Sequence, residues 1–209
     1  AHVQAGKAAI IEAGRHITEK AGKNTVEMEE HHRHKEKGLL SSKTTTTYDE
    51  AKRTDTTGSI VEGDTLTMTA GKDITLKGSA AVSTEKTTLL SGNNISIDAA
   101  ETENREIHRK QVKKSGLFGS GLGFTIGSEK TKDSYDMEET TQTGSTAGSV
   151  KGNVTITAGN ETDIRASDII AGQDSLIAGK NVTIESKDNT CRGKEEHEYK
   201  KSGLTVSLG

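Results

Sequence analysis

The sequence predicts an all-β protein built as a parallel β-helix of about 20 residues per coil, from which antiparallel β-hairpins project. Three observations predict this fold: an unusual composition, tandem repeats, and strict alternation of apolar and polar residues within each repeat. Of the 209 residues, 29% are hydrophobic and 2% are aromatic, and proline is absent. Globular domains carry nearly half apolar residues. The chain therefore fits a fold with a narrow core, such as an elongated repeat protein.

The repeats occur on two length scales. Residues 92–97 (GNNISI) match 179–184 (GKNVTI), and the phrase KSGL occurs at 114–117 and again at 201–204, so both pairs are 87 residues apart. Within these long units, glycines recur after 20 or 21 residues, as from Gly71 to Gly92 and from Gly159 to Gly179. Periods of this kind indicate short coils grouped into larger repeats.

Short segments around these glycines place an apolar residue at every second position: 66–68 (LTM), 74–76 (ITL), 95–97 (ISI), 154–156 (VTI) and 182–184 (VTI). Alternation with period two predicts strands with one buried face. In a parallel β-helix these side chains would stack inward at about 4.8 Å from coil to coil. The alternative is a β-sandwich, but a sandwich calls for aromatic core residues and irregular strand spacing. We therefore favour the helix.

We expect one repeat domain over residues 1–209, as a fragment of a longer chain, since both ends fall within the repeat pattern. The coils are predicted at approximately 1–28, 59–100 and 148–190. The intervening segments, at approximately 29–57, 101–147 and 191–209, are rich in charge and hold all five aromatic residues and five of the seven histidines. We predict that these segments are extruded hairpins, the last one incomplete.

The charges of the middle segment support a hairpin. Residues 101–114 carry five basic and three acidic side chains, whereas residues 129–139 carry five acidic and two basic ones. Folding the chain back at the glycines of 119–123 brings these arms together with opposite charge. One register places Arg109 beside Asp133 and Lys113 beside Glu129, and such cross-strand pairs stabilise a sheet.

The glycine-rich run at 114–130 (KSGLFGSGLGFTIGSEK) resembles a phosphate-binding loop only in composition. A P-loop needs a Lys-Ser or Lys-Thr pair directly after its last glycine and a buried strand before its first, and the run has neither. The dinucleotide fingerprint fails as well, because its third glycine would fall on Phe124. The second copy of the repeat passes from KSGL directly into TVSLG, so the run is interpreted as a glycine-enabled turn.

No catalytic, cofactor-binding or metal site is predicted. The weak metal candidates are His32 and His34, which would share one face of a strand as two zinc ligands do, but no third ligand is placed by the sequence. The single cysteine, Cys191, excludes an internal disulfide framework. It is interpreted as an exposed thiol, since no histidine or asparagine partner can be assigned.

The charge balance limits the partners. The net charge is −3 and the isoelectric point is near 6.2, whereas nucleic-acid binders show a basic excess. No stretch approaches the roughly 18 apolar residues that span a bilayer. We therefore expect neither a nucleic-acid partner nor an integral membrane protein.

The coils AGKDITL, SGNNISI and AGKNVTIES, together with KSGLFGSGLGFTIGSEK, resemble the haemagglutinin repeats of filamentous haemagglutinin and CdiA-type exoproteins of bacterial two-partner secretion. The resemblance covers essentially the whole chain. The hairpin phrase is more specific than the coils, and the first and last units (KEKGLLSS and KSGLTVSLG) depart from it. The resemblance implies a right-handed β-helical filament, exported through an outer-membrane transporter and displayed at the Gram-negative cell surface.

Members of this family act as adhesins or as stalks that present a receptor-binding region and a toxin. The function expected from the resemblance is thus a non-catalytic structural or adhesive segment, or the delivery region of a contact-dependent growth inhibition effector. Its partners would be the transporter and a receptor on a host or neighbouring cell. The alternative is a carbohydrate-active β-helix lyase or hydrolase, but such sites use converging acids and aromatic residues. An exposed apolar surface is predicted at the hairpin tip, formed by Leu117, Phe118, Leu122, Phe124 and Ile126.

Overall fold

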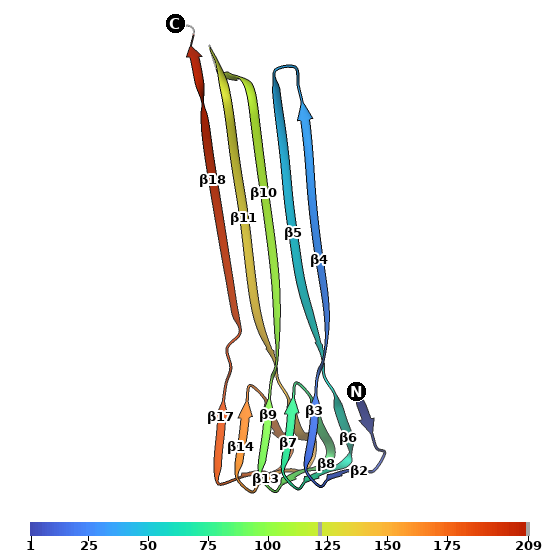
Figure 1. The fold of residues 1–209 in the computed structure, drawn as a ribbon. Coiled ribbons are helices and arrows are strands. Elements are labelled where there is room, and N and C mark those ends of the chain that lie inside the picture. The colour runs from blue at the N-terminus through green and yellow to red at the C-terminus, as the bar shows by residue number, and fades with distance from the viewer. Residues whose placement is uncertain (121–122, 208–209) are drawn as a thin grey trace. The chain divides into compact units, whose positions relative to one another are not determined.

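The computed structural model describes residues 1–120 and 123–207, and within them the chain forms eighteen strands and no helix. The predicted all-β class is confirmed, with both parallel and antiparallel sheets (Figure 1). The chain divides into two units, each formed by three stretches of sequence. The coil unit comprises Ala1–Asn24, Thr54–Thr102 and Thr140–Asn189, and the arm unit comprises Thr25–Arg53, Glu103–Glu139 and Thr190–Gly209.

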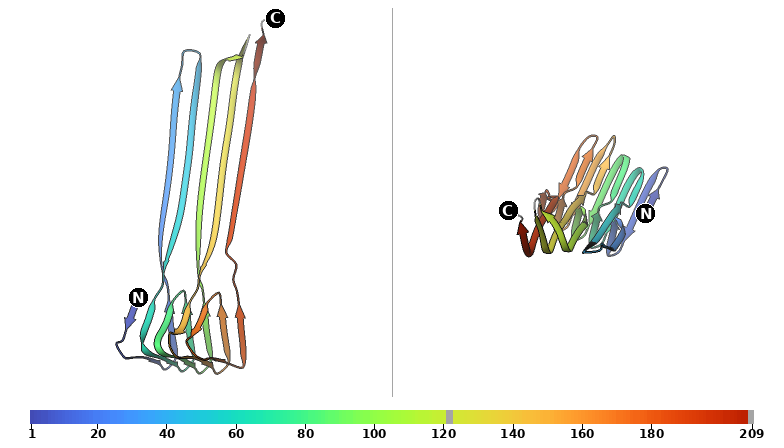
Figure 2. Two further views of the ribbon diagram at one scale, coloured as in Figure 1. Left: turned by 180° about the vertical axis from the view of Figure 1, so that it is seen from behind. Right: turned by 90° about the horizontal axis from the view of Figure 1, so that it is seen from above.

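The coil unit contains two parallel sheets, and the chain passes alternately from one to the other. The first sheet is formed by eight strands: β1 (His2–Gln4), β2 (Ala8–Ala13), β6 (Ile60–Ala70), β8 (Ala80–Ser91), β12 (Thr146–Ser149), β13 (Asn153–Ala158), β15 (Asp168–Ala171) and β16 (Ser175–Ala178). The second is formed by five: β3 (His16–Lys20), β7 (Asp73–Lys77), β9 (Asn94–Asp98), β14 (Glu161–Arg165) and β17 (Asn181–Glu185). Figure 2 shows these strands stacked one behind the next.

The core of the coil unit is formed by every second side chain of these strands, which points inward. Parallel pairing in register sets Ile74 beside Ile95 and Leu76 beside Ile97, so like residues stack. The large side chains that are fully buried in this stack are Leu66, Met68, Ile74, Leu76, Leu89, Ile95, Ile97, Val154 and Ile156. A core only a few side chains wide explains how the chain folds with so few apolar residues.

The glycines that define the short period lie where successive coils approach most closely. A Cβ atom on Gly92 would lie 2.3 Å from the carbonyl oxygen of Gly71, and one on Gly159 would lie 2.2 Å from that of Gly92. Side chains also stack beside these corners, where Asn93 Nδ2 donates to Asp73 Oδ1 at 3.0 Å. The 20-residue spacing seen in the sequence is thus a steric requirement of the coil.

The arm unit is built on one five-stranded sheet with the order β18-β11-β10-β5-β4. Its strands are β4 (Gly22–Lys37), β5 (Ser41–Thr57), β10 (Ala100–Ser120), β11 (Gly123–Thr143) and β18 (Thr190–Ser207). The polar, charge-rich sequences of these strands suit a sheet with two solvated faces, since all of β4 is exposed. Of the apolar core residues, Ile107 is the one that lies in the arm unit among the described residues.

Strands of neighbouring hairpins pair with each other, which the sequence did not predict. Strand β5 of the first hairpin pairs with β10 of the second in an antiparallel register from Arg105–Lys52 to Gly116–Ser41. Strand β18 pairs with β11 in the same sheet. The arms of successive repeats therefore form one continuous sheet rather than separate projections.

The register predicted for the middle hairpin is wrong. Arg109 pairs with Asp136 at 3.9 Å, not with Asp133, and Glu129 pairs with Lys114 at 3.9 Å, not with Lys113. Both charge signs recur every few residues along β11, so several registers match opposite charges, and charge alone does not select one.

Candidate interaction surface

The register of the arm sheet fixes which side chains share a face. The hydroxyls of Thr125 and Thr205 are hydrogen-bonded at 2.9 Å. Two further pairs, Ser128–Ser202 at 3.0 Å and Ser42–Ser115 at 2.9 Å, are hydrogen-bonded in the same way. Because successive residues of a strand point to opposite faces, Ser128–Ser202 lies on the face opposite the threonine pair. Lys114 of β10 pairs with Glu129, which is on the threonine face, so Ser115 and its partner Ser42 share the face of Ser128. We call the face that carries the serines the serine face.

The serine face carries rows of apolar side chains near the turns. Counting along β11 and β18 from the serine pair places Ile126 opposite Leu204 and Phe124 opposite Val206 on this face. On β10, Leu117 lies two residues beyond Ser115, so it shares the face. We call these side chains the apolar rows: Leu117, Phe124, Ile126, Leu204 and Val206.

The apolar rows are open to solvent. Their exposed fractions run from 37% at Phe124 to 71% at Leu204. Leu40 adds to this end of the sheet, since the Leu117 amide donates to its carbonyl at 3.0 Å and its side chain is 66% exposed. Grouped exposed apolar side chains on one face indicate a surface that meets another molecule.

Of the five residues predicted for this surface, Leu117, Phe124 and Ile126 lie together on the serine face. Leu122 and the side chain of Phe118 lie outside the part of the chain that the structure describes. Leu204 and Val206 were missed, although the repeat could have found them: KSGLTVS is the second copy of the KSGL phrase, and its alternation places Leu204 and Val206 on one face.

Glycines allow the strands of this surface to approach closely, because they have no side chain. Gly116 has a φ of +127°, and a Cβ atom there would lie 2.2 Å from the Leu40 carbonyl oxygen. At Gly127 a Cβ atom would lie 2.2 Å from the carbonyl oxygen of Ser202. Two glycines of the run, Gly116 and Gly127, are therefore required inside strands β10 and β11.

Further from the turns, ion pairs link the strands. Arg109 on β10 lies 6.0 Å from the ring centroid of Tyr48 on β5 and reaches Asp136 on β11. Lys132 pairs with Glu198 at 3.2 Å, and Lys200 reaches the same carboxylate at 2.5 Å. Hydrogen bonds from these two lysines lower the pKa of Glu198 from 4.5 to about 2. His108 with Asp49 and His197 with Asp133 make further cross-strand pairs.

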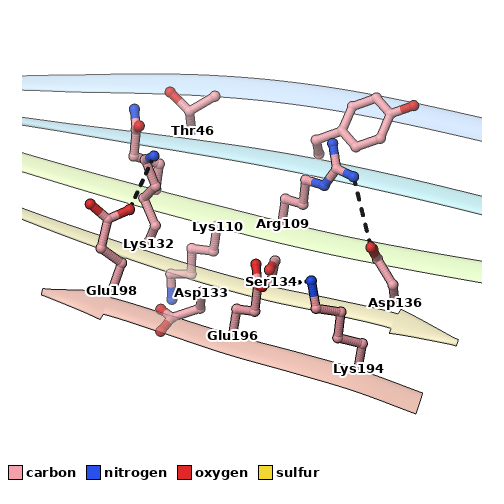
Figure 3. Close-up of a pocket in the computed structure, with 12 residues that line it drawn as sticks. Thr46, Arg109, Lys110, Lys132, Asp133, Ser134, Asp136, Lys194, Glu196 and Glu198 are labelled. Atoms are coloured by element: carbon pink, nitrogen blue, oxygen red, sulfur yellow. Dashed lines mark ion pairs between the residues drawn. The ribbon is translucent and has the colours of Figure 1, made fainter.

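Charged side chains of β10, β11 and β18 line a groove of about 580 Å³ on the arm sheet (Figure 3). It is lined by Thr46, Tyr48, Arg109, Lys110, Gln111, Lys132, Asp133, Ser134, Asp136, Lys194, Glu196 and Glu198. Three of its four carboxylates pair with Lys or Arg: Asp136 with Arg109, Glu196 with Lys194 at 2.6 Å, and Glu198 with Lys132. The fourth, Asp133, pairs with His197. Hydrogen bonds from lysines lower the pKa of Glu196 and of Glu198, which makes these two carboxylates poor proton donors.

His32 and His34 lie on β4, two residues apart and so on one face. Their Nε2 atoms lie 3.5 Å from carboxylate oxygens of Glu30 and Glu36 on the same strand. Among the described residues, no three histidine, cysteine or acidic side chains are grouped so that they could hold a metal ion. Cys191 is an exposed free thiol at the start of β18. Within the described ranges no helix is present that could cross a membrane.

Comparison with known proteins identifies the family. The family model described as "Hemagglutinin repeat" matches residues 38–203. The chain is 41% identical over 174 residues to the tRNA nuclease CdiA of Escherichia coli O6:K15:H31, covering 82% of this chain and 5% of that protein. It is equally similar, at 41% over 174 residues, to the 16S rRNA endonuclease CdiA of Enterobacter cloacae, with the same coverage.

A more distant relative is the tRNA nuclease CdiA-2 of Burkholderia pseudomallei, at 32% identity over 176 residues, which are 84% of this chain and 6% of that protein. No solved structure matches the chain. The chain thus spans about one-twentieth of the length of these three relatives. The match over most of its length shows that the chain belongs to the haemagglutinin-repeat family and is similar to the CdiA proteins of contact-dependent inhibition.

Proposed function

We propose that this chain is a non-catalytic structural and adhesive segment of a large secreted surface protein. It serves either cell adhesion or the delivery of a toxin by a contact-dependent growth inhibition effector. The observation that carries the proposal is the joining of successive hairpins, β5 with β10 and β11 with β18, into one sheet. Each repeat adds coils to the coil unit and a hairpin to the arm sheet. Such repetition suits a filament that presents a functional domain at a distance.

We further propose that the coil unit is a right-handed parallel β-helix and that the chain is one repeat domain. Two parallel sheets, visited alternately by the chain in steps of about 20 residues, support a β-helix. The right-handed twist of strands and the right-handed preference of parallel crossover connections favour that hand.

The names of the relatives describe nucleases, but the matched region is a small part of each protein. We propose that this segment takes no part in catalysis. Its place is then the exterior of a Gram-negative outer membrane, after export through a transporter of two-partner secretion. The apolar rows are the surface that would meet a receptor on a host or neighbouring cell.

A chimera tests the proposal. The matching region of the CdiA protein of E. coli O6:K15:H31 would be replaced by this segment, either unchanged or with Ile126→Ser and Leu204→Ser. The unchanged segment should support both attachment to target cells and inhibition of their growth. Loss of attachment in the variant indicates an adhesive role, and loss of inhibition with attachment intact indicates delivery.

The matched control is Thr125→Ser with Thr205→Ser, which changes the same strands on the opposite face. Equal behaviour of the two variants would show that the apolar rows have no role in contact. The catalytic alternative is tested by incubating the purified chain with acidic polysaccharides, because measurable cleavage would contradict a structural segment.

A further inference from the structure

The serine face carries a row of lysines that the sequence does not reveal. Two residues from Ser115, Ser128 and Ser202, on the side away from the turns, each strand has a lysine: Lys113, Lys130 and Lys200. The serines share a face, so these lysines share it too. They stand on three adjacent strands, about 4.8 Å from one strand to the next. We call them the lysine row.

The lysine row has more positive charge than its neighbours can neutralise. Within the described part of the chain, neither Lys113 nor Lys130 forms an ion pair, and Lys200 and Lys132 share the single carboxylate of Glu198. Desolvation and the charges of Lys132 and Lys113 lower the pKa of Lys130. Of these four lysines, two share one carboxylate and two have no ion pair, in a chain whose net charge is −3.

The opposite face provides a contrast within the same sequence. The next residues along the strands, Lys114 and Lys201, both pair with Glu129, at 3.9 and 3.5 Å. Each Lys-Lys dipeptide of the repeat therefore puts one lysine on each face. On the opposite face two lysines share one carboxylate, whereas the four lysines of the serine face named above have only Glu198 as an ion-pair partner. The excess of positive charge is therefore larger on the serine face.

Hydroxyl groups lie next to this charge. In each bonded pair, Ser42–Ser115 and Ser128–Ser202, one hydroxyl donates to the other, which leaves one O–H group free to donate outward. All four serines are partly or fully exposed. Ammonium groups with added hydroxyl donors match a dianion that has several acceptor oxygens, and phosphate is such a group.

We propose that the lysine row, together with the adjacent serine hydroxyls, binds the phosphate groups of a phosphorylated ligand. The three lysines supply charge, and the hydroxyls supply directed hydrogen bonds to phosphate oxygens. The ligand can be a soluble polyphosphate or a phosphate-bearing lipid headgroup. The second source has structural support, because Leu117, Ile126 and Leu204 lie two residues beyond the serines on the same face and offer contact to acyl chains.

The test measures binding of the 209-residue chain to inorganic polyphosphate by calorimetry at low salt. Binding to vesicles of neutral phosphatidylcholine, with or without phosphatidic acid, is measured in parallel. The variant Lys113→Gln/Lys200→Gln should weaken binding by about five-fold, which corresponds to about 1 kcal/mol for the loss of two surface charge contacts. The control Lys114→Gln/Lys201→Gln removes the same charge from the same strands on the opposite face, and it should change binding by less than about two-fold.

Each outcome decides the proposal. Binding of polyphosphate and acidic vesicles with the expected difference between variants supports phosphate recognition from either source, and binding of acidic vesicles alone supports it for lipid headgroups. Equal weakening by the two variants would mean that only net charge matters and would overturn the proposal. Absence of binding to both probes would overturn it as well. Far-ultraviolet circular dichroism of both variants verifies that the fold is retained.

Discussion

Glu19 of β3 lies directly opposite Leu76 of β7, on the inward side of the coil unit. Its side chain is 8% exposed, and its carboxylate oxygens have no hydrogen-bond partner among the residues that the structure describes. Burial raises the pKa of Glu19 from 4.5 to about 7, and the nearby amino-terminal ammonium partly offsets this. An acid thus occupies a position that the other coils fill with Leu or Ile.

We predict that Glu19 makes the coil unit less stable as pH rises. Between pH 4.5 and about 7 the folded chain keeps a proton that the unfolded chain loses, so the free energy of unfolding falls through this window, by up to about 3 kcal/mol. Glu19→Gln should remove most of this pH dependence in urea unfolding measured at pH 5 and pH 8. Glu12→Gln, an exposed position on β2, is the control and should leave the slope unchanged.

The inward position of Glu19 could have been read from the sequence. HITEK at 16–20 aligns with DITLK at 73–77, so Glu19 falls on the place of Leu76. The coils themselves were predictable for the same reason: alternation identifies the strands, and the recurring glycines mark the corners. Within each coil, the alternating residues and the corner glycine lie only a few residues apart in the sequence. Sequence patterns are most informative over such short separations.

The arm sheet shows what could not be predicted. Pairing of β5 with β10 joins residues far apart in the sequence, and polar strands carry no apolar face that would fix their register. The lysine row depends on the pairing of β10, β11 and β18, so it emerges only in the structure. The apolar tip itself was predictable from Leu117, Phe124 and Ile126, but its extension to Leu204 depends on the pairing of β11 with β18.

A methyl group at a coil corner should disrupt the stacking. Gly92→Ala would bring a Cβ atom to 2.3 Å from the Gly71 carbonyl oxygen, so one backbone must shift. We expect the free energy of unfolding to fall by about 1–3 kcal/mol, the usual cost of overpacking. Gly14→Ala is the matched control, because Gly14 occupies the corresponding corner and a Cβ atom there would meet nothing within 4 Å. Equal losses for both variants in urea unfolding would contradict a steric role.

The coil unit should fold without the arms. Replacing 25–53 by an Asn-Gly turn and 103–139 by a second one removes both hairpins, and such turns connect antiparallel strands directly. Since every fully buried large apolar side chain among the described residues lies in the coil unit, the shortened chain should keep its β-sheet circular dichroism and unfold cooperatively. A chain without cooperative unfolding would show that the arms contribute to the core.

The carboxylate of Glu198 should report on the pairing of β11 with β18. Its pKa lies near 2 because Lys200 and Lys132 hydrogen-bond its ionised form. A pKa below the unfolded value of 4.5 means that this contact stabilises the arm sheet above pH 4.5 and is lost as pH falls towards 2. Carboxyl carbon chemical shifts followed by NMR during an acid titration measure this pKa. Lys132→Gln and Lys200→Gln should each raise it, whereas Lys201→Gln, whose partner is Glu129 on the other face, should leave it unchanged. A shift of equal size in all three variants would show that net charge, and not the cross-strand contact, holds Glu198 ionised.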